Sequence, residues 1–135
     1  MSYDLMVFTL DAVPADTPTD ELLAWCRNPG HPDGWDVTSP DGTSPELVAF
    51  YDELRVDFPP VNGPDAPSGN ELAEVPGLED RLADYEIGVD HIYLAFPWGK
   101  AEKVAQTIPA VAERLGLGLY DPQGPNVFFP DGTMV

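Results

Sequence analysis

The chain has 135 residues, of which 43% are hydrophobic, and this length and composition predict a single domain, residues 1–135, with a hydrophobic core. Six basic and 24 acidic residues give a net charge of −18, so we expect neither nucleic acid nor an anionic membrane as a partner, because both are polyanions. No apolar run reaches the roughly 18 residues of a membrane span. The N-terminus also lacks a signal-peptide pattern, and the single cysteine, Cys26, fits a cytoplasmic location.

The first half of the chain reads as one strand and two helices. Residues 3–10 carry apolar side chains on both faces, which is typical of a central strand. Thr17 and Pro18 form a helix-start signal for a helix over 18–27. Ser44 and Pro45 start a second helix over 45–57, whose apolar residues fall on one face. Between the helices, residues 31–42 read as loop.

A long segment at 59–77, rich in proline, glycine and acidic residues, separates the second helix from the next strands. Connections of more than about 12–15 residues without secondary structure are usually functional or disordered. Residues 78–83 are long enough for one helical turn before the next strand.

The second half of the chain contains the longest stretch that reads as sheet. Strands are expected over 84–89 and 91–97, joined by the turn Gly88-Val89-Asp90 as an antiparallel hairpin. A helix over 100–115 follows, and Pro109 is expected to kink or split it. Strands over 117–120 and 126–129 complete the chain.

This order of elements predicts an α+β fold. We expect an antiparallel sheet of about five strands with helices packed mainly on one face, as a variant of the ferredoxin-like split βαβ arrangement.

The acidic residues concentrate in the segment 65–90, where Arg81 is the only basic residue. We expect this segment and two tryptophans in loop or strand-end positions to bind a basic protein partner, the carboxylates steering association and an aromatic ring anchoring the complex. The expected contact residues are Trp35, Asp65, Glu71, Glu74, Glu79, Asp80, Asp84, Glu86, Asp90 and Trp98. Two alternatives stay open: the acidity serves solubility or a halophilic habit, and the tryptophans only cover the sheet edge or a helix end.

No residue pattern indicates catalysis strongly. His31 with Asp33 and Asp36 is a weak metal pattern, because glycine- and proline-rich loops collect such residues for turn reasons. There is no nucleophile elbow, phosphate loop or zinc spacing. We therefore predict no catalytic residue, no metal and no cofactor.

Four stretches, YDLMVF, FPPVNGPDAP, DYEIGVDHIYLAFPW and AEKVAQTIPAVAERLGLGLYDPQ, resemble a group of small bacterial proteins. Some members of this group accompany polymorphic or contact-dependent toxins as immunity proteins. The resemblance implies a protein that inhibits a cognate toxin, and it supplies no catalytic residues to carry over to this chain.

The sequence therefore leaves two alternative functions. The first is an immunity protein, or antitoxin, that binds a cognate toxin domain through its acidic surface. The alternative is a small enzyme or ligand-binding module with a pocket between the sheet and the 61–77 loop, where Glu86, His91 and Tyr93 supply the polar groups.

Overall fold

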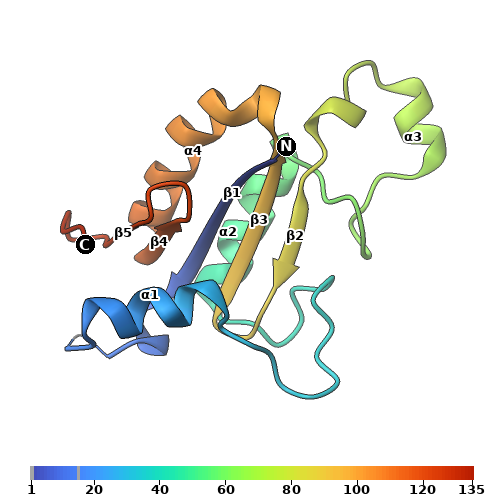
Figure 1. Cartoon of the computed structure of the whole chain (residues 1–135). Coiled ribbons are helices and arrows are strands. Elements are labelled where there is room, and N and C mark those ends of the chain that lie inside the picture. The colour runs from blue at the N-terminus through green and yellow to red at the C-terminus, as the bar shows by residue number, and fades with distance from the viewer. Residues whose placement is uncertain (1, 15) are drawn as a thin grey trace.

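The computed structural model describes residues 2–14 and 16–135, and its centre is one open antiparallel sheet (Figure 1). The strand order in space is β2-β3-β1-β4-β5, and every pairing is antiparallel. The strands are β1 (Ser2–Thr9), β2 (Asp84–Ile87), β3 (His91–Pro97), β4 (Leu117–Asp121) and β5 (Asn126–Phe128).

The helices are α1 (Thr19–Arg27), α2 (Pro45–Asp57), α3 (Gly69–Glu74) and α4 (Ala101–Arg114). Short 3-10 turns are η1 (Leu10–Ala12), η2 (Glu79–Arg81) and η3 (Trp98–Lys100). The chain from β1 to β2 and the chain from β3 to β4 each cross over one intervening strand, and α2 and α4 lie in these two connections. This is the predicted split βαβ arrangement, and β5 is an additional strand beside β4.

One face of the sheet, which we call the closed face, is covered by α2 and α4. Alternate residues of β3, namely Ile92, Leu94 and Phe96, are buried there together with Leu5 and Val7 of β1. Helix α2 begins as predicted, because the Ser44 side chain accepts a hydrogen bond from the Leu47 backbone N–H. The periodic apolar positions of α2 are also buried, namely Leu47, Phe50, Tyr51 and Leu54.

Helix α1 lies on the opposite face, so the prediction of helices mainly on one face describes α2 and α4 but not α1. Leu22 and Cys26 of α1 pack with Met6 and Phe8 of β1 in a second, smaller core cluster. Figure 1 shows α1 crossing in front of one end of the sheet, while α2 lies behind it. Burial raises the pKa of the Cys26 thiol to about 12, which agrees with its prediction as a buried apolar residue.

The segment 61–77 is not irregular throughout, because it contains α3. The Ser68 side chain accepts a hydrogen bond from the Glu71 backbone, and the Glu71 side chain accepts one from the Ser68 backbone. Helix α4 is not split at Pro109: it is one continuous helix through this exposed residue.

Both edges of the sheet are occupied by the chain itself. At the β2 edge, Ile87 N–H donates to the Val37 carbonyl (2.8 Å) and Ala83 N–H to the Pro59 carbonyl (2.9 Å). At the β5 edge, Val127 and Val135 exchange two backbone hydrogen bonds. A further strand therefore finds few free backbone groups on either side.

Within residues 2–14 and 16–135, no helix combines the length and apolarity that are needed to cross a bilayer.

Candidate functional site

Helix α1 covers only part of the sheet face on which it packs. On that face, β2, β3 and the start of β1 remain uncovered. Cross-strand pairing puts Asp84 beside Ala95 and Ala95 beside Asp4, while Glu86 pairs with Tyr93 in the next row. Register partners point to the same face of a sheet. We call the surface formed by Asp4, Asp84, Glu86, Tyr93 and Ala95 the open sheet face.

The open sheet face carries carboxylates that lack cationic partners. Asp84 and Glu86 are exposed, and neither forms an ion pair with any residue that the structure describes. Asp4 accepts hydrogen bonds from the Ser2 hydroxyl (2.7 Å) and the Tyr93 hydroxyl (2.8 Å). Burial, and next the bond to Asp4, raise the pKa of Tyr93, so its hydroxyl remains a donor to Asp4 at neutral pH.

A hollow of about 370 Å³ adjoins this face at the end of α1. It is lined by Arg27, Asn28, Pro29, Gly30, His31, Glu86, His91 and Tyr93. Glu86, His91 and Tyr93 were expected to share a pocket, and they do line one hollow. Its other wall is the end of α1 and the loop that follows. Glu86 and Tyr93 also line a neighbouring hollow, to which the 61–77 segment contributes Asn62, whereas His91 does not line that one.

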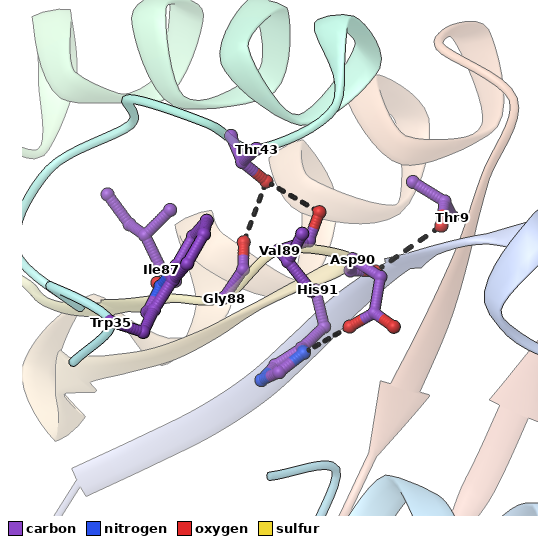
Figure 2. A network of polar contacts seen from close by, with 8 residues as sticks. All are labelled: Thr9, Trp35, Thr43, Ile87, Gly88, Val89, Asp90 and His91. Atoms are coloured by element: carbon purple, nitrogen blue, oxygen red, sulfur yellow. Dashed lines mark hydrogen bonds and ion pairs between the residues drawn. The ribbon is translucent and has the colours of Figure 1, made fainter. Parts of the chain in front are cut away.

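The turn between β2 and β3 is held from outside by two other parts of the chain (Figure 2). The Trp35 indole N–H donates to the Ile87 carbonyl (2.7 Å), and the Thr43 hydroxyl lies 2.7 Å from the Gly88 carbonyl. The Thr9 backbone N–H donates to the Asp90 carbonyl (3.0 Å). These contacts fix the start of β3, where His91 lies.

His91 is buried against neighbours that determine the position of its ring. Its Nδ1 lies 2.8 Å from Asp90 Oδ1, and the His31 ring stacks on it at 5.0 Å. The Trp25 ring meets it edge-on. A Cβ atom at Gly88 would come within 2.4 Å of the His91 ring, so glycine is required there by the close approach of that ring.

Burial lowers the pKa of His91 below its ordinary value, and the contact with Asp90 opposes this shift. His91 is therefore neutral at pH 7. The carboxylate of Asp90 only accepts hydrogen bonds, so the single ring proton is on Nδ1 and Nε2 carries a lone pair.

The ten predicted contact residues are not one surface. Three of them have structural roles: Asp65 accepts a hydrogen bond from the Tyr51 hydroxyl (2.9 Å), Asp90 bonds to His91, and Trp35 bonds to the β2–β3 hairpin. The exposed acidic residues are Glu71 and Glu74 of α3, Glu79 and Asp80 of η2, and Asp84 and Glu86 of β2. Since η2 leads directly into β2, the last four follow one another along the chain, interrupted by Arg81, and end at the open sheet face.

The two tryptophans lie at opposite ends of β3, roughly 20 Å apart by strand geometry, so they do not form one anchor. Trp98 is 51% exposed and packs on the Tyr3 ring, with 5.9 Å between ring centroids. Trp35 is only partly exposed, and its N–H group already has a partner.

Sequence reasoning missed two residues of this site, Asp4 and Arg27. An acidic residue in an otherwise apolar strand was a usable signal for Asp4. No local pattern connects Arg27 to β2, because their proximity depends on how α1 packs on the sheet.

Among the described residues, no group of three or more histidine, cysteine, aspartate or glutamate side chains converges as a metal site requires. Comparisons with protein-family models, with curated proteins and with solved structures gave no match for this chain.

Proposed function

We propose that this chain is an immunity protein, which binds a basic cognate toxin domain in the bacterial cytoplasm and blocks its active site. The observation that carries the proposal is the run of exposed carboxylates from η2 into the open sheet face, where Asp84 and Glu86 have no ion-pair partner within the described residues. A basic surface supplies the missing counter-charge.

The proposed mode of binding is through a face and not through an edge of the sheet. Both sheet edges are already paired with other parts of the chain, which disfavours addition of a partner strand. Asp80 and Asp84 steer the encounter, and the exposed ring of Trp98 at the same end of the sheet anchors the complex.

The test is a matched pair of charge reversals. Asp80→Lys/Asp84→Lys changes the acidic run, whereas Asp11→Lys/Glu113→Lys makes the same change in net charge at exposed positions outside it. Glu71 is left unchanged, because its side chain caps α3. Association with the toxin domain encoded beside this chain is measured by surface binding kinetics at two salt concentrations.

We expect the first variant to associate about tenfold more slowly at low salt, with a smaller loss at high salt, and the control to change much less. If both variants associate like the wild type at both salt concentrations, the acidity serves solubility, and the proposal is rejected.

A second candidate function is a small-molecule site, favoured by the Asp90–His91 pair at the hollow that Glu86 and Tyr93 also line. An Asp–His pair orients a general base. However, the described residues that line this hollow include no serine or cysteine nucleophile. A metabolic operon around the gene favours this second function, and a neighbouring toxin gene favours the first.

A further inference from the structure

His91 offers one hydrogen-bond acceptor at the hollow at the end of α1. The residue is 2% exposed, and it lines this hollow. Figure 2 shows the second ring nitrogen, Nε2, on the side of the ring away from Asp90. Nε2 forms no hydrogen bond with the residues that the structure describes, yet it is not sealed from solvent. Nε2 is therefore available to a hydrogen-bond donor that enters the hollow.

Two further groups in the same hollow are also acceptors. Glu86 supplies a carboxylate that has no ion pair within the described residues. The Tyr93 hydroxyl donates its proton to Asp4, so its remaining capacity is to accept. Arg27, on the opposite wall, is exposed and forms no ion pair with Glu86 that would neutralise it.

We propose that this hollow receives one arginine side chain of the protein partner, a proposal that rests on the function proposed above. The guanidinium group donates to Glu86 and to His91 Nε2, and its planar face packs on the Tyr93 ring. An arginine fits better than a lysine, because its rigid fork of donors reaches two separate acceptors at once. The adjacent carboxylates Asp4 and Asp84 add to the favourable potential for a cation.

The first experiment needs no partner protein. The full chain, labelled with ¹⁵N, is titrated at low ionic strength and pH 7.5 with N-acetyl-arginine amide, and NMR follows the backbone and the His91 ring nitrogens. N-acetyl-lysine amide and N-acetyl-citrulline amide are the comparison probes, since citrulline has nearly the shape of arginine without its charge.

We expect saturable shifts at Glu86, His91 and Tyr93 with the arginine probe, including the Nε2 resonance, and binding at least about fivefold weaker with the other two probes. Shifts that spread over the whole acidic surface without saturating, or equal binding of the lysine probe, would overturn the proposal.

A variant pair locates the interaction. Glu86→Gln keeps the shape of an exposed side chain on β2 and removes its charge. This variant is expected to bind the arginine probe at least about fivefold more weakly than the wild type. Glu113→Gln makes the same change on the exposed side of α4 and is expected to have no effect. Equal weakening by both variants contradicts a local site.

The two proposals fail separately. If the arginine probe misses the hollow while Asp80→Lys/Asp84→Lys still slows association with the toxin domain, the arginine site is wrong and the immunity function stands. If the probe binds but the charge reversal has no effect on toxin binding, the hollow recognises a guanidinium group and the immunity function is wrong.

Discussion

The two faces of the sheet differ although they share the same strands. On the closed face, Ile92, Leu94 and Phe96 of β3 are covered completely by α2 and α4. On the other face, the intervening residues Tyr93 and Ala95 are only partly covered, because α1 packs over β1 and not over β2. The comparison shows that β3 buries Ile92, Leu94 and Phe96 completely on one face, whereas Tyr93 and Ala95 on the other face remain accessible.

The largest expected effect on stability comes from the closed face. Leu94→Ala removes a fully buried side chain, and it should lower the free energy of unfolding by about 2–5 kcal/mol. Ala95→Ser, one residue along and on the open sheet face, should change it by about 0.5 kcal/mol or less. Urea denaturation monitored by circular dichroism measures both values, and similar losses would contradict the division between the two faces.

Gly88→Ala should have the next largest effect. The new methyl group would lie within 2.4 Å of the His91 ring, so the ring or the turn must move, at a cost of about 1–3 kcal/mol. Gly99→Ala is the matched control, because nothing lies within 4 Å of a Cβ atom at that position. The NMR signals of the His91 ring should shift in the first variant only, and unchanged signals in both would mean that Gly88 does not determine the ring position.

Acidification should destabilise the protein through His91. Its pKa is lower in the folded than in the unfolded state, so the unfolded state binds more protons below the ordinary histidine pKa of about 6.5. The contribution of His91 to the free energy of unfolding is therefore fully present above about pH 6.5. It is lost as the pH falls toward the lower pKa of the folded state. The charged or titratable groups that face the ring are Asp90, His31, Glu86, Arg27 and Tyr93.

The measurement is urea denaturation from pH 7.5 to 5 for the wild type and for His91→Phe, which keeps an aromatic ring but cannot titrate. The other titrating groups act in both proteins, so the difference between the two curves isolates His91. We expect the wild type to lose stability relative to the variant as the pH falls, and parallel curves would refute this.

A small effect on stability is also expected at Trp98. Its ring is 51% exposed, so Trp98→Ala should change the free energy of unfolding by only about 0.5 kcal/mol. If the proposed immunity function holds, the same substitution should weaken binding to the toxin domain by about 2 kcal/mol, mainly through faster dissociation. Trp35→Ala provides the contrast, because it removes a hydrogen bond to Ile87 and should cost stability instead. A Trp98 variant that binds the toxin like the wild type would show that this ring is no anchor.

Local sequence patterns predicted most of the elements and their order. The β2–β3 hairpin follows from its alternation and its Gly88-Val89-Asp90 turn, and α2 follows from its Ser44–Pro45 start and its apolar period. Helix α3 was missed because the proline and glycine residues around it outweighed the capping pair Ser68 and Glu71, which was the available signal.

The site was predictable only in part, for a physical reason. Alternation along a single hairpin already places Glu86, His91 and Tyr93 near one another, so the sequence determined these three polar groups of the hollow. Which face α1 covers depends on how Leu22 and Cys26 pack with β1 and with Tyr120 and Val127, which are far away in the chain, and no local pattern encodes it. The tertiary structure alone therefore decided that the end of α1 forms the second wall of the hollow, that Asp4 bonds to Tyr93, and that Trp35 serves the fold while Trp98 remains exposed.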